Sequence, residues 1–353
     1  MSRPRQPDEL PDPGDAAADT QRPLERFHET PEPLRNPLDA GPLPRELGGS
    51  RDMHLGELRK LLERHVRPDF TTAIDGVRIC RVDRAASPES SMSGRVLVVI
   101  AQGGKRLALG DRVYDYRAGQ YLVASVDLPV TGQVIDAVPG HPTLSFGMTL
   151  EPAAIAELLP EVGPGDLSQP PGTAGPGIAV SDAPDELLDA IVRLLRLIER
   201  PRDRKILVPL VKREILWRLV NGDQGEVVAQ LGRADSSLDH ITRAVQWIRE
   251  NYARPFRVEE VAHLSGMSVS AFHRNFQAVT AMTPIQFQKH IRLQAARLLL
   301  ANRPNDITGV SSRVGYDSPS QFSREYRRQF GAPPSLDAAR MREGARLAAA
   351  AQP

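Results

Sequence analysis

Two nine-residue segments in the last third of the chain share one arrangement of polar and aromatic residues. Ser268–Phe276 and Ser318–Tyr326 both place serine at the first and third positions, phenylalanine at the fifth, arginine at the seventh and an aromatic residue at the ninth. Serine hydroxyls and arginine guanidinium groups bind phosphates and base edges, and arginine pairs bidentately with guanine in the major groove. The repeat therefore predicts contact with double-stranded DNA.

Each segment is expected to be an amphipathic helix. Phe272, Phe276 and Val279 are spaced i, i+4 and i+7, which places them on one buried face. The second copy repeats this spacing with Phe322, Tyr326 and Phe330. The opposite faces, expected to be exposed, carry Ser270, His273, Arg274 and Gln277 in the first copy and Ser320, Gln321, Arg324, Arg327 and Arg328 in the second.

The elements around each copy are typical of a helix-turn-helix. A short amphipathic helix and a glycine, Gly266 or Gly315, precede each segment. Ser268 and Ser318 stand at the first positions, where a serine caps the helix and the free backbone N–H groups suit a phosphate. Either copy alone could be an ordinary surface helix with solvated arginines, but two copies favour DNA binding.

A single helix, from Pro284 to about Asn302, joins the two copies. At 1.5 Å per residue its roughly sixteen helical residues span about 24 Å. Helices held at its two ends could then reach successive major grooves, about 34 Å apart on one side of DNA.

Charge supports this assignment weakly. The segment from Asp239 to Pro353 has 16 basic and 9 acidic residues, a net charge of +7, whereas the rest of the chain has 29 basic and 35 acidic residues, a net charge of −6. A basic block on an acidic partner is expected when one domain meets a polyanion.

The upstream region predicts a second domain. Short alternating runs separated by glycine turns, from about residue 72 to 150, indicate a small antiparallel barrel or sandwich. Pro209 is expected to open a helix that ends at Val220, and Gln102-Gly103-Gly104-Lys105 is expected to be a hairpin turn. The predicted order is a proline-rich disordered tail (1–52), a barrel with helices (53–222, the helices from about 151), a linker (223–237), an all-α DNA-binding domain (238–342) and a flexible tail (343–353).

Single residues and composition argue against a disulfide-bonded, a membrane-spanning or a metal-binding protein. One cysteine, Cys80, excludes an internal disulfide and fits a reducing compartment; its alternating surroundings predict a strand. With no run of about 18 apolar residues, no membrane span is expected, and the cytoplasm is the predicted location. No metal or other cofactor is expected, because His141 is the one histidine within the strand region.

The final domain resembles the AraC/XylS family of transcription regulators over about residues 238–342. The landmarks are Gly266-Met267-Ser268, Phe272-His273-Arg274, Thr283-Pro284, Arg292-Leu293, Ala296-Arg297-Leu298-Leu299, Val314-Gly315-Tyr316, Phe322-Ser323-Arg324, Phe330-Gly331 and Pro333-Pro334. Ser311 departs from the alanine usual there, but remains small. The upstream region resembles one AraC-type N-terminal subgroup through Gln102-Gly103-Gly104-Lys105, Tyr116–Gly119, and Gln120-Tyr121-Leu122 running into Asp127-Leu128-Pro129-Val130.

This resemblance implies a cupin-like barrel that binds an unidentified small-molecule effector or mediates dimerisation. It implies base contacts by Ser270, His273, Arg274, Ser320, Gln321 and Arg324. It implies DNA-backbone contacts by Ser268, Ser318, Lys289, Arg292 and Arg328. It also admits RNA polymerase and a second copy of the chain as partners.

Two other functions stay open at this point. A barrel of this kind could be a metal-dependent enzyme, although such sites need two or three histidines and a carboxylate. A DNA-binding protein could also be architectural and sense no effector, against which the long upstream domain argues. The sequence favours a non-enzymatic regulator.

Overall fold

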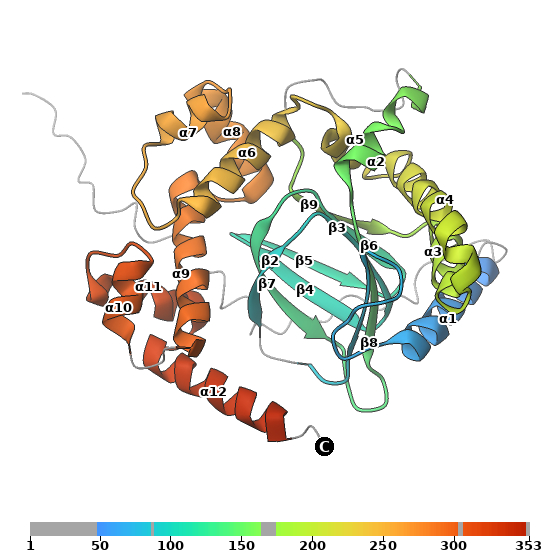
Figure 1. Cartoon of the computed structure of the whole chain (residues 1–353), viewed down its shortest axis with the longest axis horizontal. Coiled ribbons are helices and arrows are strands. Elements are labelled where there is room, and N and C mark those ends of the chain that lie inside the picture. The colour runs from blue at the N-terminus through green and yellow to red at the C-terminus, as the bar shows by residue number, and fades with distance from the viewer. Residues whose placement is uncertain (1–47, 86–87, 164–173, 303–305, 351–353) are drawn as a thin grey trace, which may run out of the picture.

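The computed structural model describes residues 48–85, 88–163, 174–302 and 306–350. Two antiparallel sheets face each other in its N-terminal half (Figure 1). The five-stranded sheet has the order β1-β8-β3-β6-β9 and the four-stranded sheet β2-β7-β4-β5. The strands are β1 (Val77–Val82), β2 (Glu89–Ser93), β3 (Val96–Gln102), β4 (Gly104–Leu109), β5 (Arg112–Arg117), β6 (Gln120–Ala124), β7 (Leu128–Ile135), β8 (Thr143–Thr149) and β9 (Ile178–Asp182).

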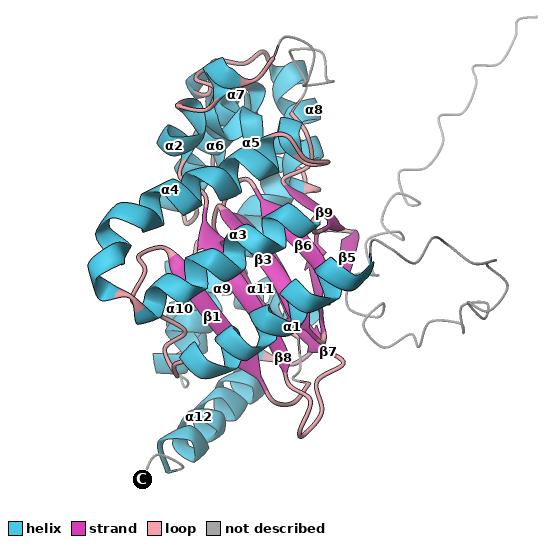
Figure 2. Cartoon of the chain, turned by 90° about the vertical axis from the view of Figure 1, so that its right-hand side faces the viewer, coloured by secondary structure: helices cyan, strands magenta, loops and turns pink. Residues whose placement is uncertain are grey.

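Alternation along the strands assigns the two faces of the five-stranded sheet. Leu97 and Val99 of β3 pack outward in one buried cluster with Leu188 and Ile191 of α3. Val98, between them in sequence, must point toward the other sheet because successive side chains of a strand alternate. The outer face is covered by α1 (Gly48–His65), α3 (Asp185–Arg196) and α4 (Pro201–Val220), which cross the strands in Figure 2.

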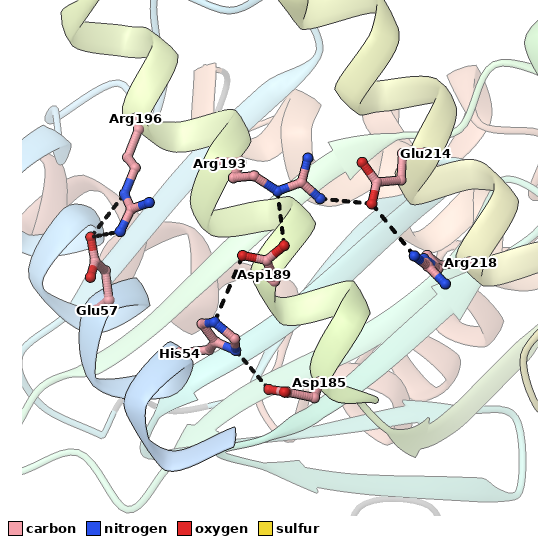
Figure 3. Close-up of polar contacts among 8 residues, drawn as sticks. All are labelled: His54, Glu57, Asp185, Asp189, Arg193, Arg196, Glu214 and Arg218. Atoms are coloured by element: carbon pink, nitrogen blue, oxygen red, sulfur yellow. Dashed lines mark hydrogen bonds and ion pairs between the residues drawn. The ribbon is translucent and has the colours of Figure 1, made fainter. Parts of the chain in front are cut away.

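Charged residues tie these three helices together (Figure 3). His54 Nδ1 of α1 lies 2.6 Å from Asp185 Oδ1 of α3. Arg193 of α3 donates to Glu214 of α4 over 2.7 Å, and Arg196 donates to Glu57 of α1 over 2.7 Å. The helices therefore form one layer on the sheet.

Several boundaries differ from those predicted. Helix α1 begins at Gly48, inside the expected 1–52 tail, where Arg51 Nη2 donates to the Gly119 carbonyl over 2.8 Å; residues 1–47 lie outside the described part. Helix α4 begins at Pro201, so Pro209 stands within it and does not open it. Proline is well placed at Pro201, because the first helical N–H has no partner within the helix.

The glycine motif of the barrel is not a hairpin turn. Strand β3 ends at Gln102 in one sheet and β4 begins at Gly104 in the other, so the chain crosses between the sheets here. Gly103 has φ +73°, and a Cβ there would lie 2.2 Å from Thr143 Oγ1. Only glycine fits this corner.

The segments predicted as a linker and as a C-terminal tail are largely helical. Helix α5 (Gly225–Gly232) packs on α2 (Pro152–Ala156), so closely that a Cβ on Gly232 would lie 2.7 Å from the Ala156 nitrogen. Helix α12 (Pro334–Ala350) extends through most of the expected tail, in keeping with its alanine-rich end. A short 3₁₀ turn follows each of α2 and α3, at Leu159–Glu161 and Leu197–Glu199.

The remaining helices form the predicted all-α domain. They are α6 (Ser237–Glu250), α7 (Val258–Leu264), α8 (Val269–Thr280), α9 (Pro284–Asn302), α10 (Ile307–Arg313) and α11 (Pro319–Phe330), with α12 after them. Helices α7 and α8 form one helix-turn-helix unit and α10 and α11 the other, with α9 between them (Figure 1). The predicted fold class, a two-sheet domain followed by a two-unit helical domain, is confirmed.

Candidate nucleic-acid interface

The first recognition helix, α8, starts as its serine predicts. Ser268 is the N-cap, with extended backbone (φ −65°, ψ 151°), and its hydroxyl accepts from the Ala271 N–H over 3.4 Å. The preceding Gly266 has φ +74°, a conformation that favours glycine. The turn between α7 and α8 is therefore fixed by its own residues.

Aromatic packing sets which face of α8 is free. Phe272 and Phe276 are fully buried, their ring centroids lie 5.3 Å apart, and Phe276 packs edge-on against Phe287 of α9. Because this face is anchored, the opposite one is turned to solvent. The predicted base-contact residues Ser270, His273 and Arg274 are all exposed, as is Gln277.

The second recognition helix, α11, repeats this design. Ser318 caps it by accepting from the Gln321 N–H over 3.3 Å, and Phe322 and Tyr326 are fully buried. Gly331, with φ +74°, ends the helix. Ser320, Gln321 and Arg324 are exposed, as are Arg327 and Arg328.

A partly buried carboxylate organises the side of α11 nearest α9. Glu325 accepts from the Tyr316 hydroxyl over 2.7 Å, from Gln321 Nε2 over 3.1 Å and from Lys289 Nζ over 3.1 Å. Burial alone would raise the pKa of Glu325, but these donors hold it below its ordinary value. Gln321 and Lys289, a predicted base contact and a predicted backbone contact, are thus both held by one carboxylate.

Arg292 is placed differently from what was predicted. Its guanidinium donates to the carbonyls of Tyr252 and Gly315, each over 2.7 Å, and of Ala253 over 3.5 Å, and it lies 5.8 Å from the Tyr316 ring centroid. The side chain is half-buried. Three of its five N–H groups bind carbonyls within the domain, so Arg292 links α9 to both units.

Arg328 keeps its guanidinium exposed near His290 of α9. Burial, and then the charge of Arg328, lower the pKa of His290 to about 4. The imidazole is therefore neutral at pH 7, and the positive charge on this side of the second unit comes from the arginine.

The barrel docks on the first unit without covering its exposed face. Val279, Phe276 and Met282 belong to the same buried cluster as Leu122 and Leu128 of the sheets. The Gly177 N–H donates to the Val279 carbonyl over 3.0 Å, and the Ala174 N–H donates to Asn275 Oδ1 over 2.9 Å. An ion pair joins Arg249 of α6 to Asp127. These contacts use the inward side of α8, while Arg274 and His273 stay exposed.

Two family models match two separate parts of the chain. The model described as the AraC-type transcriptional regulator N-terminus matches residues 73–227, and a helix-turn-helix domain model matches residues 261–340. The chain belongs to the AraC family of transcription regulators. Its two-sheet domain is the part matched by the first model, and both recognition helices lie within the second.

Curated relatives of this AraC-family chain are regulators by name. The transcriptional activator RhaS of Salmonella schwarzengrund is 27% identical over 146 residues, 41% of this chain and 51% of that protein. The virulence regulon activator VirF of Yersinia enterocolitica is 28% identical over 154 residues, 42% of this chain and 55% of that protein. The chain spans about half the length of these relatives.

Two solved structures also align with parts of this chain. Apo ToxT from Vibrio cholerae aligns with a TM-score of 0.46 at 8% identity, over 76% of this chain and 98% of that one. A probable AraC-family regulator from Rhodopseudomonas palustris aligns with a TM-score of 0.27 at 30% identity, over 29% of this chain and 97% of that one.

Sequence reasoning missed the residues that support the interface from inside. Glu325 stands at a variable position of the repeat, and Asp337 of α12 belongs to no motif. Asp337 accepts from the Tyr326 hydroxyl over 2.7 Å and from Arg297 Nε over 2.9 Å. The sequence did contain a signal, since each is an acidic residue among basic and aromatic ones. A carboxylate needs a partner when it is buried.

Proposed function

We propose that this AraC-family chain is a sequence-specific DNA-binding transcription regulator whose N-terminal domain senses a small molecule. The observation that carries the proposal is the pair of capped helices, α8 and α11, that expose the same polar pattern from either end of α9. Arg274 and Arg324 hold equivalent positions, and neither forms an ion pair with another described residue.

The length of α9 supports simultaneous binding by both helices. It has 19 residues, which at 1.5 Å each span about 28 Å. Successive major grooves on one side of DNA lie about 34 Å apart. One chain would then cover two half-sites, with Ser270, His273 and Arg274 at the first and Ser320, Gln321 and Arg324 at the second.

DNA-backbone contacts are assigned to four of the five predicted residues. Ser268 and Ser318 begin the recognition helices, where free N–H groups favour a phosphate. Arg328 is exposed, and Lys289 has donors beyond the one that Glu325 accepts. Arg292 is omitted because three of its five N–H groups bind carbonyls that hold the domain together.

The effector, the protein partners and the location are proposed without assigning residues to them. The barrel would bind the effector, and RNA polymerase and a second copy of the chain are further proposed partners, in the cytoplasm. No helix among the described residues is long and apolar enough to span a membrane. Nor do three or more potential metal ligands come together in that part of the chain.

Selection from a random DNA pool tests the proposal. The full chain should enrich one sequence with two conserved blocks about one helical turn apart, and should bind it about a thousandfold or more tighter than random DNA. Arg202→Ala, an equal charge change on an exposed residue of α4, should leave that ratio unchanged. Equal binding of the selected and random sequences would refute specific recognition.

A further inference from the structure

The one cysteine of the chain lies on the inner face of the five-stranded sheet. Cys80 of β1 stands opposite Ser145 of β8, which in turn stands opposite Ile100 of β3. Ile100 belongs to the buried cluster that contains Tyr116 of the facing sheet, so this row of side chains points toward that sheet. Strand β1 is the outermost strand of its sheet, and Cys80 is partly exposed. A small molecule can therefore reach the thiol from the edge of the sheet.

An amine from the facing sheet reaches the same row. Lys105 of β4 donates from Nζ to Ser145 Oγ over 2.9 Å, across the space between the sheets. Opposite residues of an antiparallel pair have Cβ atoms about 5 Å apart, so an amine that binds Ser145 also lies near the Cys80 thiol. Burial lowers the pKa of Lys105, an effect that the charge of a Cys80 thiolate opposes. The neutral amine, which can accept a proton, is therefore easier to form here than on an exposed lysine.

A phenol with an unused hydroxyl stands beside this amine. Tyr116 of β5 lies opposite Lys105, is 3% exposed, and makes no hydrogen bond through its hydroxyl to any described residue. Burial raises the pKa of Tyr116, and the charge of Cys80 raises it further, so the hydroxyl stays a neutral donor near the thiol. Buried polar groups are ordinarily hydrogen-bonded, and this donor lacks an acceptor. The cluster thus combines a nucleophile, a base and a free hydrogen-bond donor.

We propose that Cys80 is a modification site for small α,β-unsaturated carbonyl compounds, with Lys105 as the base and Tyr116 as the donor to the carbonyl oxygen. The thiolate is the form of cysteine that reacts. Lys105 takes the thiol proton, sulfur forms a bond to the β-carbon, and the carbon–carbon double bond opens to an enolate. Tyr116 stabilises the charge that develops on the enolate oxygen. Lys105 then returns the proton to the α-carbon, so the adduct contains every atom of both reactants and no oxidant is needed.

The other charged side chains on these inner faces lie away from the cluster or in solvent. Strand alternation places four of them on the inner faces, and all four are exposed and form no ion pair with Lys105: Arg78, Glu89, Arg112 and Asp182. Lys105 is the member of this set whose contact with Ser145 brings it to the row of Cys80.

This inference deepens the proposed function and rests on it, because the electrophile would be the small molecule that the N-terminal domain senses. Ile100 and Tyr116 belong to the same buried cluster as Val279 of α8. A group attached to Cys80 would enter the space beside this cluster and displace its packing. The adduct should therefore change the affinity of the chain for its selected DNA by about fivefold or more.

Mass spectrometry of the intact chain tests the site. The chain and N-acetylcysteine are treated with methyl vinyl ketone at about pH 7, where only a few per cent of an ordinary thiol is ionised. Addition to the chain should be about tenfold or more faster than to N-acetylcysteine, and Cys80→Ser should abolish it. Lys105→Met should remove most of this gain, and Tyr116→Phe should slow addition several-fold. Arg106→Met, which removes the neighbouring outward-facing cation paired with Asp115, is the matched control and should leave the rate unchanged.

A pH series distinguishes a base from a residue that only shapes the space. If Lys105 removes the proton, the loss caused by Lys105→Met should shrink between about pH 7 and pH 9, where a thiol ionises without help. Circular dichroism and thermal unfolding verify that each variant is folded. A loss that is equal at every pH, or addition to Cys80 no faster than to N-acetylcysteine, overturns the site.

DNA binding by the same samples separates this inference from the proposed function. If Cys80 is modified with the help of Lys105 but the chain binds no specific DNA, the regulator proposal fails and the site stands. If the chain binds specific DNA and Cys80 stays unmodified, the reverse holds. An adduct that leaves the affinity for the selected DNA unchanged overturns the role of the electrophile as the sensed molecule.

Discussion

Replacing Arg292 with alanine should destabilise the DNA-binding domain without removing a contact to DNA. The guanidinium spans the carbonyls of Tyr252 and Gly315, both at 2.7 Å, and so links α9 to the end of α6 and to the turn before α11. Hydrogen bonds to charged groups contribute about 1.5 to 3 kcal/mol each, and a carbonyl left unpaired adds a desolvation cost. Since the bonds share one side chain, we expect a loss of about 2 to 4 kcal/mol in the free energy of unfolding.

Urea unfolding and DNA binding at several salt concentrations measure the two effects separately. Removing a side chain that binds a DNA phosphate would lower the salt slope of binding by about one, with little change in stability. For Arg292→Ala we expect the opposite, a lower urea midpoint and an unchanged slope. Arg328→Ala, at an exposed position proposed to contact phosphate, is the comparison and should lower the slope. Wild-type stability together with a reduced slope for Arg292→Ala would refute this linking role.

Two further predictions concern stability. Because the pKa of His290 falls from 6.5 to about 4 on folding, the native chain binds fewer protons than the unfolded chain between these values. The free energy of unfolding should therefore fall by up to about 1.4 kcal/mol per pH unit as the pH drops from 6.5 to 4, and His290→Gln should flatten that part of a urea-midpoint profile; an unaltered profile would count against a buried neutral imidazole. Gly315 and Gly331 both have positive φ, but a Cβ on Gly315 would lie 2.1 Å from the Ala253 carbonyl oxygen, whereas one on Gly331 would meet nothing within 4 Å. Gly331→Ala should cost about 1 kcal/mol and Gly315→Ala about 3 kcal/mol or more, and equal losses in thermal unfolding would contradict the close packing of the turn.

The parts of the fold that the sequence predicted depend on local patterns of residues. Spacing of three and four placed Phe272 and Phe276 inward and Arg274 outward, and the caps at Ser268 and Ser318 followed from residue type and position. These features depend on residues within one or two helical turns, so a single sequence contains them.

Contacts between remote segments could not be predicted in this way. In the sequence, Arg292 does not differ from an exposed arginine on any helix. Only the folded chain brings the Tyr252 and Gly315 carbonyls to it. The chain crosses from one sheet to the other at Gly103, although the sequence around it is typical of a hairpin turn. Three of the five residues of strand β2 are serine, so it lacks the apolar alternation of a strand, and it pairs at a sheet edge.

The shared core of the barrel and the first helix-turn-helix unit was also unforeseen. The sequence predicts separate domains because a polar segment stands between them, whereas Leu128 of β7 and Val279 of α8 lie in one buried cluster. Apolar residues at the end of α8 could serve either core, and their number alone does not distinguish the two.

Base preference measured separately at the two half-sites tests the central claim most directly. The selected site is varied one base pair at a time and titrated with the unaltered chain, Arg274→Ala and Arg324→Ala. The account predicts that each variant loses about 1 to 3 kcal/mol of discrimination in one half-site only, and that the affected half differs between the two. Uniform weakening at all positions by both variants, with base preference intact in both halves, would contradict recognition by the paired helices.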